Sequence, residues 1–381
     1  MNFTFNAVAD IIFKSGSAKE LGQHVKPRMA RPILLTDKGL IDAGLVEPAL
    51  DSLKTAGLET LLFDDVAADP PTPKVREAID AARQHNADGV IGLGGGSSMD
   101  TAKLVAVLMN SDQSLEDIFG LNQVKAPRMP LVLLPTTAGT GSEVTNISVV
   151  TTEADEKIGI IDNTLYPDLA VLDPALTIGL PRPVTAATGI DAMVHAIEAY
   201  TNIHRKNPVS DALGREALRL LSSNIVTVCE TPGNVKARED MMLGAMLAGQ
   251  AFTNSPVGAV HGMAYPLGGI FHIPHGLSNS LMLEPVLRFN APNAAHQYAE
   301  LAMIVSPGAT GSDTEKCDAF INRMVDIVEA TGVERRLSQL GISHNDIPRM
   351  AEDAMKAERV LQNNARKVTY EDAVEMYTEV L

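Results

Sequence analysis

The stretch ADGVIGLGGGSSMDTAKLVAV, residues 87–107, predicts a strand, a glycine-rich turn and a helix in immediate succession. Residues 90–93 form a short apolar run typical of a buried strand, and a helix containing Lys103 is expected after the turn. The turn consists of Gly94, Gly95, Gly96, Ser97 and Ser98. Glycines let a backbone approach a ligand closely, and the N–H groups at a helix start attract anions, so this is a candidate pyrophosphate site. A purely structural turn is also consistent with the pattern, which matches neither G-x-G-x-x-G nor a Walker loop.

Apolar runs and amphipathic segments alternate on both sides of this stretch. RPILLT, VEPALDSLKTAG, ETLLFDDV and PTPKVREAIDAARQHNA precede it and predict strand, helix, strand and helix. This alternation indicates an α/β domain with a parallel sheet. After the rigid break Pro181-Arg182-Pro183, apolar residues recur at helical spacing and strand-like runs almost vanish. We therefore expect an α/β domain over residues 1–182 and an all-helical domain over residues 183–381, with a ligand cleft between them.

Composition narrows the classes of function. The 381 residues carry a net charge of −16, spread along the chain, which argues against a nucleic-acid partner. The N-terminus lacks the pattern of a secretory signal, and no run of about 18 apolar residues suggests a membrane span, so a cytoplasmic protein is expected. Cys229 and Cys317 are isolated, which disfavours a disulfide framework or a thiolate zinc site.

Two further segments support a nucleotide site. LLPTTAGTGSEVT, residues 133–145, is a strand followed by a loop rich in hydroxyl groups and glycine, with Thr136, Thr137, Thr140 and Ser142. The strand in PILLTDKG is followed by Asp37, whose carboxylate could accept the ribose hydroxyls of NAD and repel the 2′-phosphate of NADP. Because the acid precedes the glycines along the chain, the topology is expected to differ from that of a Rossmann domain.

The helical half contains a candidate metal site. In GIDAMVHAIEAY, Asp191 and His195 are four residues apart, so both would project from one face of a helix. HGMAYPLGGIFHIPHG, residues 261–276, adds His261 and His275, with His272 as a spare. One carboxylate and three imidazoles suit Fe²⁺ or Zn²⁺, although a helix contact without metal would also explain Asp191 and His195. Such an ion would lower the pKa of a bound alcohol, and the alkoxide could pass hydride to a nicotinamide.

These motifs resemble those of the iron-containing, or group III, alcohol dehydrogenases over essentially the whole chain. GLGGGSSMDTAK, LPTTAGTGSEVT, ATGIDAMVHAIEAY and the HGMAYPLG…PHG segment carry the resemblance. It implies the two-domain fold shared with dehydroquinate synthase, a homo-oligomer (dimer or higher), and metal ligands at Asp191, His195, His261 and His275. The implied cofactor and pocket positions are Asp37, Gly94 to Ser98, Thr136, Thr137, Thr140 and Lys157 for NAD, and Ile147 and Phe252 for substrate.

The chain departs from many relatives at two positions. Tyr265 stands where they often carry a histidine assigned to a proton relay, and a phenol has an ordinary pKa near 10. His272 is a candidate substitute. Asp69 stands where relatives often have asparagine.

The leading hypothesis is an NAD-dependent, divalent-metal alcohol dehydrogenase or aldehyde reductase acting on a small alcohol, diol or aldehyde. One alternative is a dehydroquinate synthase-like lyase, which the scarcity of basic residues in the loops disfavours. Another is a non-catalytic dinucleotide- or metal-binding sensor, which the complete ligand set disfavours.

Overall fold

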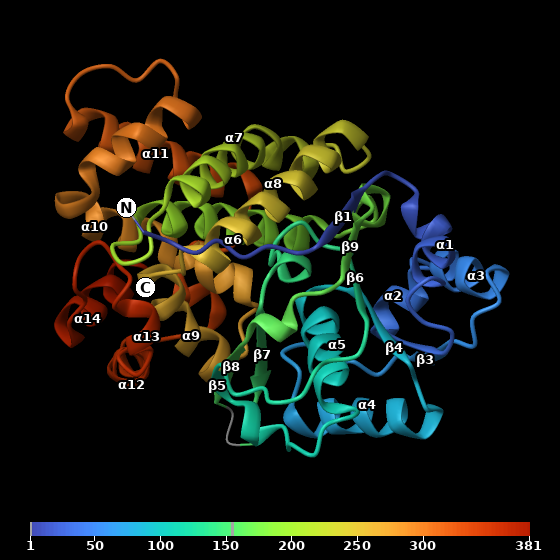
Figure 1. The fold of residues 1–381 in the computed structure, drawn as a ribbon. Coiled ribbons are helices and arrows are strands. Elements are labelled where there is room, and N and C mark those ends of the chain that lie inside the picture. The colour runs from blue at the N-terminus through green and yellow to red at the C-terminus, as the bar shows by residue number, and fades with distance from the viewer. Residues whose placement is uncertain (1, 154–155) are drawn as a thin grey trace. The chain divides into compact units, whose positions relative to one another are not determined.

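The computed structural model describes residues 2–153 and 156–381 and divides into two compact units (Figure 1). One unit comprises Asn6–Gly179. The other comprises Leu180–Leu381 together with the chain start up to Phe5. No helix among the described residues combines the length and the apolar character that crossing a membrane requires.

The first unit is built on a six-stranded sheet in the order β1-β9-β6-β4-β2-β3, in which every pairing is parallel. Its strands are β1 (Asp10–Phe13), β2 (Pro32–Leu35), β3 (Leu61–Phe63), β4 (Gly89–Gly94), β6 (Leu131–Pro135) and β9 (Leu169–Leu172). The predicted parallel α/β sheet is therefore confirmed. Side chains alternate between its two faces, so Ile33 and Leu35 enter one core and Leu34 the other.

Helices cover both faces of this sheet, which explains why the central strands are continuous apolar runs. Residues of α4 (Thr72–His85) and α5 (Gly96–Leu108) share one core, and residues of α1 (Leu21–Val25) and α3 (Glu47–Thr55) share the other. The unit also contains α2 (Lys38–Asp42) and 3₁₀ turns at Ser17–Glu20, Glu116–Ile118, Ser142–Val144, Asn163–Leu165 and Pro174–Thr177. A small second sheet in the order β5-β8-β7, not anticipated from sequence, comprises β5 (Gly120–Leu121), β8 (Lys157–Ile161) and β7 (Ile147–Thr151).

The second unit contains helices and no strand among its described residues, which confirms the predicted all-α half. Its long helices are α6 (Arg182–Thr201), α7 (Pro208–Glu230), α8 (Val235–Asn254), α9 (Ala259–Phe271), α10 (His275–Val305) and α11 (Asp313–Thr331). The shorter ones are α12 (Ile347–Ala354), α13 (Glu358–Leu361) and α14 (Tyr370–Glu379), with 3₁₀ turns at Leu337–Leu340 and His344–Asp346.

Helix α6 lies at the centre of this unit and packs against α7, α8 and α10 (Figure 1). Residues from Thr185 to Thr201 are almost all buried, as expected for a helix surrounded by others. Side-chain caps define where its neighbours begin: Asn207 accepts from the Ser210 N–H at the start of α7, and Asn234 accepts from the Ala237 N–H at the start of α8. Helix α6 is therefore enclosed by its neighbours. Its buried residues include the polar Asp191, His195 and Glu198, which need hydrogen-bond or ionic partners inside the unit.

Candidate metal and nucleotide sites

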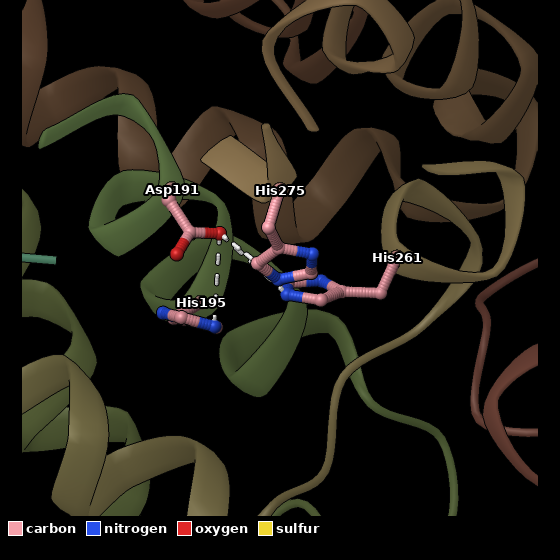
Figure 2. Close-up of side chains that lie close together, drawn as sticks. All are labelled: Asp191, His195, His261 and His275. Carbon is pink, nitrogen blue, oxygen red and sulfur yellow. Dashed lines mark ion pairs between the residues drawn. The ribbon is translucent and has the colours of Figure 1, made fainter. Parts of the chain in front are cut away.

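Four side chains converge in the helical unit: Asp191 and His195 from α6, His261 from α9 and His275 from α10. Figure 2 shows the three imidazoles grouped around the Asp191 carboxylate. One ligand atom from each lies within 4.8 Å of all the others. Asp191 Oδ1 is 3.8 Å from His195 Nε2 and 3.7 Å from Nε2 of both His261 and His275. The structure therefore brings together the four residues that the sequence singled out.

Backbone geometry explains this convergence. Asp191 and His195 lie one turn apart on α6, and His261 is in the first turn of α9. Helix α9 ends at Phe271 and is capped by His272, whose left-handed φ of 55° stops the helix. Pro274 then precedes α10, so that His275 is its first residue. At Gly276 a Cβ would lie 2.4 Å from the Ala187 carbonyl oxygen, so only glycine lets α10 start this close to α6.

Glu198 orients one of the imidazoles, a role that the sequence did not reveal. Its Oε2 lies 2.6 Å from His261 Nδ1, and its Oε1 accepts a hydrogen bond from the Val260 N–H at 2.6 Å. An Nδ1–H donated to the carboxylate leaves the Nε2 lone pair of His261 facing Asp191. Burial opposes the charged form of His261, but Glu198 outweighs it and the pKa of His261 is raised.

The electrostatics of Asp191 suit a cation. Burial disfavours its charged form, yet the neighbouring histidines His195, His275 and His261 outweigh burial and lower the pKa of this carboxyl. The donor set is thus one carboxylate oxygen and three imidazole nitrogens, a combination found around Fe²⁺ and Zn²⁺. Side-chain exposure is 5% or less for all but His275, which is 36% exposed, so the group is open to solvent on that side.

Two further residues border the group. The Phe252 ring stacks on His195 with centroids 4.3 Å apart, so the predicted pocket residue lies against a candidate ligand. Asn279, one turn after His275 on α10, lies fully buried with its Nδ2 2.6 Å from Asp191 Oδ1. Sequence reasoning missed Asn279, although its spacing of four from His275 repeats that of Asp191 and His195.

The two predicted relay residues have contrasting surroundings. Burial raises the pKa of Tyr265 to about 12, with Glu198 adding to the effect. His272 is exposed at the end of α9, and its ring makes no hydrogen bond to any residue in the described ranges. A proton-relay role for either residue stays a prediction.

In the α/β unit, predicted nucleotide residues gather at one edge of the sheet. Gly94 ends strand β4, and Asp37 and Thr136 come just after the adjacent parallel strands β2 and β6, so the three residues share the carboxyl edge, where ligands bind in open α/β sheets. A Cβ at Gly94 would lie 2.5 Å from Ser98 Oγ, and one at Gly96 would lie 3.0 Å from Thr140 Cγ2. The glycine turn and the threonine loop therefore face each other closely.

Several groups along this edge remain free to receive a ligand. Thr137 Oγ1 is buried without a hydrogen-bond partner in the described part of the chain. Gly95 precedes α5 and no side chain caps the start of this helix, so no side chain occupies the N–H groups that would bind an anion. Asp37 accepts a hydrogen bond from the Leu40 N–H through Oδ1. Together, Asp37, the glycine turn and the threonine loop are compatible with a bound dinucleotide.

Lys157 and Asp69 form an ion pair beside the glycine turn. Lys157 Nζ lies 2.8 Å from Asp69 Oδ1, and the Asp69 N–H donates to Ser97 Oγ at 3.1 Å. Asp69 has a positive φ of 47°. Asp69, which stands where relatives often have asparagine, is therefore the ion-pair partner of Lys157, a predicted cofactor residue.

A buried ionic cluster behind the turn was not anticipated. Lys103 is completely buried, and its Nζ donates to Thr145 Oγ1 at 3.1 Å and to the carbonyl oxygen of Ile147, a predicted pocket residue, at 2.7 Å. Burial lowers the pKa of Lys103 to about 8 and raises that of Glu143 to about 7. Asp100 accepts from Ser142 Oγ at 2.6 Å, so the cluster ties α5 to the loop after β6.

Comparison with known proteins identifies the family. Residues 9–174 match the family described as iron-containing alcohol dehydrogenase, and residues 185–381 match its C-terminal family. The chain is 35% identical over 375 residues, 96% of each protein, to a sulfoacetaldehyde reductase from Bilophila wadsworthia. It is 35% identical over 353 residues to a 1,3-propanediol dehydrogenase from Citrobacter freundii, covering 92% of this chain and 91% of the relative.

The fold comparison agrees. The structure matches a sulfoacetaldehyde reductase from Bifidobacterium kashiwanohense solved in complex with NAD⁺, with a TM-score of 0.89 and 28% identity over 100% of this chain and 99% of the other. These findings favour hydride-transfer chemistry over the lyase and sensor alternatives. The chain belongs to the iron-containing alcohol dehydrogenase family, and it is an oxidoreductase.

Proposed function

We propose that this chain is an NAD-dependent, divalent-metal-dependent enzyme that interconverts a small alcohol or diol and its aldehyde by hydride transfer. The observation that carries the proposal is the convergence of Asp191 with His195, His261 and His275 in a chain of this family. A bound divalent ion would supply Lewis acidity toward the substrate oxygen, and NAD would supply the hydride acceptor.

The ion is proposed to be Fe²⁺, with Zn²⁺ as the alternative. The family is iron-containing by name, and the mixed oxygen and nitrogen donor set accepts either ion. Glu198 supports the assignment because its hydrogen bond keeps the His261 Nε2 free to bind a cation. His275, with its partly exposed ring, would border the substrate.

NAD is proposed to bind at the carboxyl edge of the α/β sheet. The proposed contacts are Asp37, Gly94, Gly95, Gly96, Ser97, Ser98, Thr136, Thr137, Thr140 and Lys157. The Asp37 carboxylate favours NAD over NADP because it would repel a 2′-phosphate. The NAD⁺ complex of the Bifidobacterium reductase supports the choice of cofactor.

The substrate is proposed to be small, and the proposed substrate residues are Ile147 in the α/β unit and Phe252 in the helical unit. Relatives named for 1,3-propanediol and sulfoacetaldehyde support a short carbon chain. His272 remains the proposed proton relay, since the pKa of Tyr265 is about 12. We also propose that residues 1–182 form the NAD-binding domain and residues 183–381 the metal-binding domain. The protein is further proposed to be a homo-oligomer and to be cytoplasmic.

The decisive experiment follows NADH at 340 nm with metal-stripped protein and a panel of C2 to C6 alcohols and diols, after adding back Fe²⁺, Zn²⁺ or nothing. We expect activity only with metal, lost in His261→Ala and kept in the control His296→Ala, whose ring is exposed on α10 and pairs with Asp313. No turnover on any substrate, in protein that binds both NAD and metal, would overturn the proposal.

A further inference from the structure

The C-terminal segment of the chain packs against the helix that carries His261. Helices α12 and α13 contact α9 (Figure 1). A Cβ at Gly262 would lie 2.6 Å from Leu361 Cδ2, so α9 and the end of α13 approach each other closely. On α14, the buried hydroxyl of Tyr377 donates to the carbonyl oxygen of Met263 at 2.6 Å. The C-terminal segment therefore contacts the two residues that directly follow His261.

Asn364, a buried residue between α13 and α14, makes the most extensive of these contacts. Its Nδ2 donates to Asn290 Oδ1 and to the carbonyl oxygen of Arg366, both at 2.7 Å. Its Oδ1 accepts from Asn290 Nδ2 at 2.9 Å and from the Ala259 N–H at 3.4 Å. A carboxamide has two N–H donors and two acceptor lone pairs, so Asn364 uses all of them and its orientation is set.

These hydrogen bonds reach two helices that carry candidate ligands. Ala259 is the first residue of α9 and lies two residues before His261. Asn290 is a buried residue of α10, the helix that begins with His275. The side chain of Asn364 thus ties the first turn of α9 to α10.

The first turn of α9 depends on remote partners because it has no local side-chain cap. Gly258 precedes the helix and offers no side chain that could accept from its free N–H groups. The Ala259 N–H donates to Asn364, and the Val260 N–H donates to Glu198 Oε1 at 2.6 Å. A Cβ at Gly258 would lie 3.3 Å from Glu198 Oε1 and 3.4 Å from Asn364 Oδ1, so both side chains approach the same residue.

Glu198 and Asn364 have different tasks at this helix start. Glu198 orients the His261 ring directly, because its Oε2 lies 2.6 Å from Nδ1. Asn364 acts instead on the backbone that carries the ring, through the Ala259 N–H. A helix end whose N–H groups lose their partners frays, and fraying here would move His261 away from the other ligand atoms.

We propose that Asn364 is a positioning residue for the candidate metal centre: it holds the first turn of α9 against α10 and so fixes where His261 Nε2 meets the other ligand atoms. This inference rests on the proposed metal function of the same site. The neighbouring Asn363 supports it, because its Nδ2 donates to the carbonyl oxygen of Val257, just before α9, at 3.0 Å. The C-terminal segment is thus part of the metal centre, although all four candidate ligands precede it.

The test compares how full-length wild type and Asn364→Leu hold Co²⁺. The Kd for Co²⁺ is measured in competition with a chelator, and the visible absorption of the bound ion is recorded. Leucine is similar in size but forms no side-chain hydrogen bond, so we expect Kd to rise about ten-fold, the low end of the effect of removing a group that supports a metal ligand. The visible spectrum should change because it reports the ligand geometry. The Kd for NAD, measured by calorimetry, should stay at the wild-type value.

Asn364→Ser is the milder companion variant, and it keeps the test decisive should the leucine variant not fold. A hydroxyl is too short to reach both helices, so Kd should rise in the same direction by a smaller factor. In a double-mutant cycle of Asn364→Ser with Asn290→Leu, the changes in binding free energy should add up to less than their sum. The reason is that the bonds between Asn290 and the start of α9 pass through Asn364.

Asn207→Leu is the matched control. Asn207 is likewise a buried asparagine of the helical unit, and its Oδ1 accepts from the Ser210 N–H at the start of α7, a helix that carries none of the four candidate ligands. This variant should lower Tm and leave the Kd for Co²⁺ unchanged. A wild-type Kd and spectrum in the Asn364 variants, or an equal rise of Kd in Asn207→Leu, would overturn the inference and leave the metal function intact. Wild type that binds no Co²⁺ would overturn both.

Discussion

The two candidate sites differ in what their positions demand. In the helical unit, the candidate metal site consists of side chains that long helices hold together, such as His195 on α6 and His275 on α10. At the sheet edge, the candidate nucleotide site consists mainly of backbone that side chains must not obstruct, as at Gly94 and Gly96. Damage to the helical site should therefore come from removing atoms, and damage to the sheet edge from adding them.

Adding one methyl group at the glycine turn should have the largest effect. In Gly94→Ala the new Cβ would lie 2.5 Å from Ser98 Oγ, so the turn must shift at a cost of about 1–3 kcal/mol. We expect a lower free energy of unfolding in urea and severe loss of NAD binding by calorimetry. Gly159→Ala is the control, since a Cβ there meets nothing within 4 Å. Wild-type NAD affinity in Gly94→Ala would remove the turn from the cofactor site.

Removing one charge behind the ligands should have the next largest effect. Glu198→Gln keeps the shape of the side chain, but it loses the carboxylate that orients the His261 ring. We expect the Kd for Fe²⁺ to rise about 10–100-fold while NAD affinity stays unchanged. Parallel loss of NAD binding would show that the variant disturbs more than the metal site.

The Asp69 and Lys157 pair should have a smaller effect. Both atoms belong to a partly exposed ion pair, and such pairs contribute about 0.2–1 kcal/mol. Asp69→Asn frees the Lys157 charge, so we expect NAD to bind about two- to five-fold more tightly at low salt. The gain should shrink as ionic strength rises. Weaker binding at every salt concentration would mean that Asp69 itself contacts the cofactor.

Removing the Tyr265 hydroxyl should have the smallest effect. Because the pKa of Tyr265 is about 12, the phenol stays protonated throughout the pH range 6–9 and contributes no titration there. Tyr265→Phe should therefore keep the pH dependence of kcat/KM, whereas His272→Ala should change it if His272 is the relay. A pH profile altered by Tyr265→Phe alone would return the relay to the phenol.

The reach of sequence reasoning also differs between the two regions. The parallel sheet and the helical half could be predicted because hydrophobic periodicity indicates them. The grouping of Asp191 with three histidines could be predicted because these residue types bind metals and their motifs resemble those of a known family. Glu198 and Asn279 could not be assigned roles, since those roles consist of hydrogen bonds that only the folded structure reveals. The edge strand β1 escaped notice for the same reason, as it has four residues and pairs with distant β9.

Lys103 has a consequence for chemical labelling. An amine with a pKa near 8 is a much better nucleophile at neutral pH than an ordinary lysine, yet Lys103 is sealed inside its unit. Amine-directed reagents can reach it only when α5 and the loop after β6 separate. The rate at which Lys103 is modified, measured by mass spectrometry, would therefore report how often the nucleotide unit opens transiently.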